Sequence, residues 1–204
     1  VILSFFTLNF ETDIRKAITF NIIGPITLMV SAIYCYQRKI SFENIKRIVD
    51  MLAYPLMATL VYMYLYTPSV KDVVTNTESN FETSGGFGPN QVSTILGLGM
   101  FVFFALFLMY SNTKRLRIIN LALAVLTAYR GIVTFSRGGV ITGVVMMVSL
   151  LVLVYFYSNR RVRSKIAAIS LFLVLGGGLV WSYTIYTTNG MIEYRYANKD
   201  ARGR

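Results

Sequence analysis

The fold class is decided by a solid apolar run, VVMMVSLLVLVYF, at residues Val144–Phe156. A membrane-spanning β-strand alternates apolar and polar residues over about ten positions, and this run does not alternate. In a bilayer every backbone amide needs a hydrogen-bond partner within its own element, so an apolar run of this length predicts an α-helix. We therefore place Val144–Phe156 inside a membrane-spanning helix.

Six apolar stretches of this kind occur along the chain, each near the roughly 20 residues that cross a hydrocarbon core. The whole chain is 55% hydrophobic and 14% charged, with a mean hydropathy of +0.57, which exceeds the usual range of a soluble domain. The sequence predicts an all-α fold, a polytopic transmembrane helical bundle. The predicted spans are Ile18–Tyr36, Ile48–Tyr66, Gln91–Tyr110, Ile118–Phe135, Gly139–Tyr157 and Ile166–Ile185.

The ends of the chain predict a piece of a larger protein. The sequence opens at Val1 without a starting Met, and the basic tail from Tyr194 to Arg204 shows no fold of its own. We expect a transmembrane region over residues 1–185 and the truncated start of an outer loop over residues 186–204.

Charge predicts which ends of the spans share a side. Eleven of the 20 basic residues gather in three hinges, which the positive-inside rule assigns to the cytoplasm. Topology thus accounts for the net charge of +11, and we do not expect nucleic-acid binding. The eleven are Arg38, Lys39, Lys46, Arg47, Lys114, Arg115, Arg117, Arg160, Arg161, Arg163 and Lys165.

Histidine is absent and Cys35 is the only cysteine. Zinc sites of the usual Cys/His kind and histidine-based catalytic triads therefore cannot be built from this sequence. We predict neither a metal nor a cofactor.

Three spans begin on the outer face with helix-breaking or capping residues. Asn and Ser are preferred N-caps, Gly lets a ligand approach the backbone, and a helix N-terminus attracts phosphate. Packing is the alternative explanation for each motif, and Gly138 with Gly139 then only permits a tight turn around Ser136–Gly139. The motifs are Asn21 with Gly24 and Pro25, SGGFGPN at residues 84–90 and SRGG at residues 136–139.

Asn90 and Gln91 make the first turn of the third span polar, together with Ser93 and Thr94. This predicts a helix end that lines a hydrated pocket, or else simple N-capping at the membrane surface.

Arg130 and Arg137 are seven residues apart, nearly two turns on one face if the helix continues, with Arg130 about 10 Å deeper. Arginine within a membrane usually marks function, although one near a helix end can extend its head to the interface. For both arginines, a functional role and extension to the interface are alternative explanations. A guanidinium can bind two oxygens of a diphosphate at once.

The ordered motifs GGFGPNQVST (85–94) and TFSRGG (134–139), with Ile14-Arg15-Lys16 and Gly24-Pro25 before them, resemble the bacterial O-antigen ligase and polymerase superfamily. The resemblance covers most of the chain. It implies a multi-pass inner-membrane glycosyltransferase whose active face is periplasmic. Its partners would be a lipid-linked oligosaccharide donor, a glycan or glycolipid acceptor and membrane lipids.

The resemblance also assigns roles to single residues. Arg137, and Arg204 through Gly203-Arg204, would hold the diphosphate leaving group without a metal. The family's catalytic histidine lies on a large periplasmic loop that follows the last span here, and family members have about a dozen spans. Substrate-binding roles are predicted for Arg130, Asn90, Gln91, Ser136, Gly138 and Arg195.

Two rival functions fit the same sequence features. A transporter or flippase of an anionic lipid-linked glycan would also need arginines in a hydrated cavity, but at several membrane depths. A membrane anchor without chemistry would tolerate substitution of the outer motifs.

Overall fold

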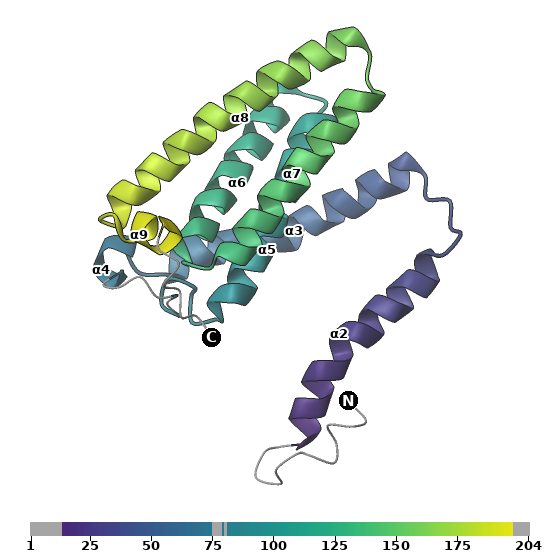
Figure 1. The fold of residues 1–204 in the computed structure, drawn as a ribbon. Coiled ribbons are helices and arrows are strands. Elements are labelled where there is room, and N and C mark those ends of the chain that lie inside the picture. The colour runs from purple at the N-terminus through teal and green to yellow at the C-terminus, as the bar shows by residue number, and fades with distance from the viewer. Residues whose placement is uncertain (1–13, 75–78, 80, 198–204) are drawn as a thin grey trace. The chain divides into compact units, whose positions relative to one another are not determined.

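The computed structural model describes residues 14–74, 79 and 81–197, and every regular element among them is a helix (Figure 1). The chain divides into two units, residues 1–45 and 46–204. The first unit holds α2 (Ile14–Cys35) and the first residues of α3 (Phe42–Tyr66), and the remaining helices belong to the second. The predicted all-α fold is confirmed.

Five helices are long and apolar enough to cross a membrane. They are α3, the continuous helix Pro89–Tyr110, α6 (Lys114–Val133), α7 (Arg137–Tyr157) and α8 (Arg160–Thr187). Pro89–Tyr110 consists of α5 (Pro89–Ala105) and a π-helical last turn, η1 (Leu106–Tyr110). The first predicted span, Ile18–Tyr36, is helical as far as Cys35, in α2, but is not among these five. The protein is a multi-pass membrane protein.

Apolar side chains on the outside of the second unit agree with a lipid environment. Leu175 and Leu179 of α8 are 61% and 73% exposed, and many other apolar side chains of the same helix are also exposed. Such a continuous apolar surface is unfavourable in water and is expected where lipid chains cover a helix.

Several helices begin earlier than the apolar runs predicted. Lys114 and Arg115 lie in the first turn of α6, and Arg160 and Arg161 in the first turn of α8. The predicted hinges between spans are therefore shorter than expected. Cations at a helix N-terminus oppose the helix dipole, so their position is better explained by membrane topology than by helix electrostatics.

The centre of the second unit is α5, which packs between α6 and α7. One apolar cluster forms around Val102, Phe103 and Phe104 of α5, with Ala124 of α6 and Leu151 of α7. Figure 1 shows α7 and α8 running antiparallel beside each other, joined by a short turn.

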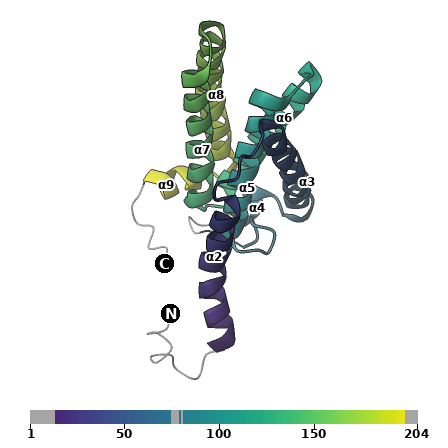
Figure 2. The same ribbon diagram turned by 90° about the vertical axis from the view of Figure 1, so that its right-hand side faces the viewer.

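A second cluster lies at the other end of this unit. It joins α4 (Val70–Val73), the end of α6, Phe135 and α9 (Met191–Ala197), the last of which contributes Ile192. Figure 2 also places α9 beside the start of α7. We call this region, with the first turns of α5 and α7 and the turn 134–136, the Arg137 end. The turns 111–113 and 158–159, with the first turns of α6 and α8, form the basic end.

At the basic end, Arg163 of α8 binds the last backbone carbonyls of α7 and the turn that follows them. Its Nε donates to the carbonyls of Tyr155 and Ser158, both at 3.0 Å, and its Nη2 donates to the carbonyl of Phe156 at 3.2 Å. The last carbonyls of an α-helix have no partner within the helix. Arg163 therefore caps the C-terminus of α7 and holds the α7–α8 turn.

Candidate functional site

The candidate site is built at the Arg137 end, where the first turns of α5 and α7 are joined by side chains. Ser136 Oγ donates to Asn90 Oδ1 at 2.8 Å, and Ser93 Oγ donates to the Ser136 carbonyl at 2.8 Å. The structure thus brings together two predicted site residues, Asn90 and Ser136, that are 46 positions apart in the sequence.

The two helix ends are not capped in the expected way. The N-cap of α5 is Gly88 and that of α7 is Ser136, and neither makes a side-chain capping bond. Asn90 lies inside the first turn of α5, so the alternative that Asn90 is the N-cap is wrong. The Ser136 hydroxyl donates to Asn90 and does not cap α7, and Gly88 has no side chain that could cap α5.

Small residues explain how α5 and α7 come so close. A methyl group added at Gly139 would overlap the Ser93 carbonyl, and one added at Gly97 would overlap the Gly139 carbonyl. A methyl group added at Gly143 would overlap the Met100 side chain and the Gly97 carbonyl. Ser93-x3-Gly97 and Gly139-x3-Gly143 are small-x3-small patterns typical of membrane helix pairs. This spacing is the signal in the sequence that could have predicted the contact between the two helices.

Gly138 behaves differently from Gly139. It is exposed, and a methyl group added there would meet no atom within 4 Å. Of these two adjacent glycines only Gly139 is required for the close approach of α5 and α7, so packing does not explain Gly138.

The turn before α7 lies earlier than predicted. The sequence placed it around Ser136–Gly139, whereas α6 ends at Val133 and α7 begins at Arg137. Phe135 takes the left-handed conformation, with φ of 57°, and is 1% exposed. This conformation costs a non-glycine residue about 1–2 kcal/mol, and burial of the Phe135 ring offsets it.

Arg137 is the first residue of α7 and is half-buried. Its guanidinium carbon lies 5.9 Å from the centre of the Tyr196 ring, a cation–π distance. Among the described residues no carboxylate lies within ion-pair distance of Arg137. Its hydrogen-bonding groups are therefore available to a ligand.

α9 brings Arg195 and Tyr196 to the same place, which corrects the expectation for the tail. The sequence predicted no fold from Tyr194 onwards, but Tyr194–Ala197 is helical because Ile192, at 0% exposure, anchors α9 in the second cluster. The Trp181 ring packs edge-on against Tyr196, with centroids 5.1 Å apart. Burial raises the pKa of the Tyr196 hydroxyl, and the charges of Arg137 and Arg195 partly oppose this shift.

Arg130 is held elsewhere. It is 4% exposed, and its Nη2 donates to the Met63 carbonyl at 2.6 Å and to Thr67 Oγ1, both in or next to α3. The Tyr64 ring centre is 5.3 Å from its guanidinium carbon. Arg130 is thus bound to protein groups at the C-terminal end of α3.

Arg130 and Arg137 also do not share a helical face, because the helix between them is interrupted by the turn 134–136. Arg130 binds α3, whereas Arg137 faces α9. The exposed Gln91 lies near Gly88 in the first turn of α5. Arg204 lies outside the described residues.

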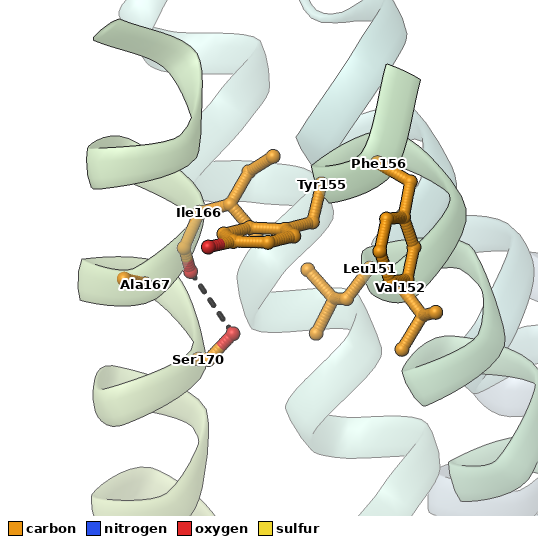
Figure 3. Close-up of a pocket in the computed structure, with 7 residues that line it drawn as sticks. All are labelled: Leu151, Val152, Tyr155, Phe156, Ile166, Ala167 and Ser170. Carbon is orange, nitrogen blue, oxygen red and sulfur yellow. Dashed lines mark hydrogen bonds between the residues drawn. The ribbon is translucent and has the colours of Figure 1, made fainter. Parts of the chain in front are cut away.

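Two apolar grooves lie on the surface of this unit. Figure 3 shows an apolar groove between α7 and α8 near the basic end, lined by Leu151, Val152, Tyr155, Phe156, Ile166, Ala167 and Ser170. A second follows one face of α3 from Tyr54 to Tyr66. Neither includes a predicted site residue, and their apolar linings suit lipid chains. In the part of the chain that the structure describes, no three His, Cys, Asp or Glu side chains gather as possible metal ligands.

Comparison of the chain with models of known protein families, with curated proteins and with solved structures gives no match. The family resemblance therefore rests on the motifs quoted above, and the site rests on its own geometry.

Proposed function

We propose that the protein is a membrane glycosyltransferase of the O-antigen ligase or polymerase type. It would take a glycan from a polyprenyl diphosphate carrier and join it to an acceptor sugar. The acceptor is lipid A core for a ligase and a second carrier-linked repeat for a polymerase. The setting is the bacterial inner membrane, with the Arg137 end on the periplasmic side.

One observation supports the proposal most strongly. Arg137 is the first residue of α7, half-buried and without a carboxylate partner among the described residues. It lies beside the two helix starts that the Ser136–Asn90 hydrogen bond joins and that lack side-chain caps. A guanidinium and free backbone N–H groups are the donors that bind phosphate oxygens in proteins. These residues also belong to the two motifs on which the resemblance depends.

The reaction gives Arg137 an electrostatic role. The acceptor hydroxyl attacks the anomeric carbon, the bond from that carbon to the diphosphate oxygen breaks, and the diphosphate leaves with the bonding electrons. The proton of the hydroxyl passes to a general base, which the resemblance locates on a following loop. Arg137, with Arg204 as its expected partner, stabilises the charge that develops on the leaving group.

The neighbouring residues would support this role in different ways. Asn90 and Ser136 fix the two helix starts relative to each other. Gly138 has open space where other residues carry a side chain, so it leaves room for a phosphate group beside the backbone of α7. Gln91 and Arg195 lie at the same end and are proposed to contact the substrate.

The test is deletion of the gene and analysis of the cell's glycans. A ligase predicts accumulation of carrier-linked polymer on the periplasmic side and loss of glycan from lipid A core. A polymerase predicts that single repeats replace the polymer. Accumulation of the carrier-linked glycan on the cytoplasmic side would contradict the proposal and favour a flippase.

A further inference from the structure

A group of unpaired hydrogen-bond donors surrounds Arg137. Arg195 Nε and the Tyr196 hydroxyl are both buried and have no hydrogen-bond partner. Both are on α9, and the Tyr196 ring faces the guanidinium of Arg137. Three adjacent residues therefore present donors, and no acceptor from the described residues meets them.

Such an arrangement is costly without a ligand. A buried donor left unpaired costs about 1–3 kcal/mol, and more when it is charged. Guanidinium groups only donate, so neither arginine can accept a hydrogen bond from Tyr196. The group that would satisfy all three residues is rich in acceptor oxygens and negatively charged.

We propose that Tyr196 is a further ligand-binding residue, whose hydroxyl donates to an oxygen of a phosphate group held between Arg137 and Arg195. This deepens the proposed function and rests on it, because it identifies the diphosphate of the carrier as the occupant. Arg195 Nε donates to the same group.

The surroundings of Tyr196 suit this role. Ile192 fixes α9 in the apolar cluster, and Trp181 packs edge-on against the Tyr196 ring, so the ring is placed by contacts that do not involve its hydroxyl. Burial raises the pKa of the hydroxyl, which therefore keeps its proton at neutral pH and can donate it in a hydrogen bond.

The experiment separates the hydroxyl from the ring. The protein, in phosphatidylcholine nanodiscs, is titrated with farnesyl diphosphate and with inorganic diphosphate as probes. Tyr196→Phe removes only the hydroxyl, and Tyr194→Phe, at an exposed position of the same helix, is the matched control. Because a hydrogen bond to a charged group is strong, Tyr196→Phe should weaken binding of both probes about tenfold or more. Tyr194→Phe should bind as the wild type does.

Each other outcome has a definite meaning. Binding by Tyr196→Phe within twofold of the wild type overturns the inference and leaves the proposed function standing. A wild type that binds neither probe contradicts both the inference and the diphosphate role of Arg137. In nanodiscs that contain phosphatidylglycerol, loss of farnesyl diphosphate binding would identify the recognised phosphate as a phospholipid headgroup, and the carrier assignment would be overturned.

Discussion

Arg163 at the basic end and Arg137 at the Arg137 end both lie beside a tyrosine ring, at 5.2 Å from Tyr155 and 5.9 Å from Tyr196. Their other contacts differ. Arg163 donates to three backbone carbonyls and completes the end of a helix. Arg137 makes no ion pair among the described residues, and its neighbours on α9 have unpaired donors of their own. The comparison separates an arginine used for folding from one that is available to a ligand.

Arg130 resembles Arg163, because its guanidinium is also used in hydrogen bonds within the fold. Its Nη2 binds two acceptors of or beside α3, and it is almost fully buried. Its Nε has no partner, so part of its hydrogen-bonding capacity remains unused. We therefore expect Arg130 to affect stability first and substrate binding second.

The largest expected difference between the two ends is their accessibility from outside the cell. With Cys35 replaced by Ser, single cysteines are placed at Asn112 and Asn159 of the basic end and at Ser79 of the segment before α5, all exposed positions. In right-side-out membrane vesicles an impermeant thiol reagent should label position 79 and leave the other two unlabelled until detergent is added. The reverse pattern would refute the assignment of sides, and the proposed function with it.

The next largest effect concerns the two adjacent glycines. Gly139→Ala forces a methyl group into the Ser93 carbonyl, so α5 and α7 must separate, and we expect about 3 kcal/mol or more of destabilisation. Gly138→Ala meets open space and should cost nothing, since Ala favours a helix over Gly by about 1 kcal/mol. Thermal unfolding in detergent measures both. Equal stability of the two variants would show that α5 and α7 are not in close contact.

A moderate effect is expected for Arg130. Arg130→Ala removes a buried cation with its two hydrogen bonds and leaves a cavity. We expect the free energy of unfolding to fall by about 2–4 kcal/mol. Arg130→Lys keeps the charge and one of the two bonds, so the loss should be smaller. Glycan transfer by the Arg130→Lys variant, normalised to protein abundance, should remain close to that of the wild type. A loss of transfer at full stability would place Arg130 in the substrate site instead.

The smallest effect is expected for Arg163. Arg163→Ala leaves the last carbonyls of α7 to water and lipid headgroups near the membrane surface, so the protein should lose about 1–2 kcal/mol of stability. Glycan transfer per molecule should not change. Activity that falls more than stability would show that the basic end takes part in the reaction.

The helices could be predicted because their cause is local. Length and hydropathy define a membrane span, and the last five predicted spans coincide with the five long apolar helices. The residues at which the helices begin could not be predicted. A helix continues beyond its apolar run when charged side chains such as Lys114 can reach the membrane interface.

The site was predictable only in part, because its details depend on contacts between helices. The sequence predicts that Asn90 and Ser136 are polar residues at helix starts. It does not distinguish a pair that caps the helices from a pair that forms the hydrogen bond between them. Gly138 and Gly139 look alike in the sequence, and only the position of α5 distinguishes them. The position of Tyr196 beside Arg137 could not be predicted, because it depends on where α9 packs relative to the start of α7.

The central claim is tested most directly by a matched pair of substitutions, Arg137→Lys and Arg163→Lys. Both keep the charge and lose the two-pronged guanidinium. Glycan transfer is measured in cells lacking the native gene and normalised to the membrane level of each variant. The account predicts that Arg137→Lys loses about 100-fold or more in transfer at normal abundance, as is typical when one preorganised donor is lost, while Arg163→Lys transfers normally. Near-normal transfer by Arg137→Lys would contradict it, as would an equal loss in both variants.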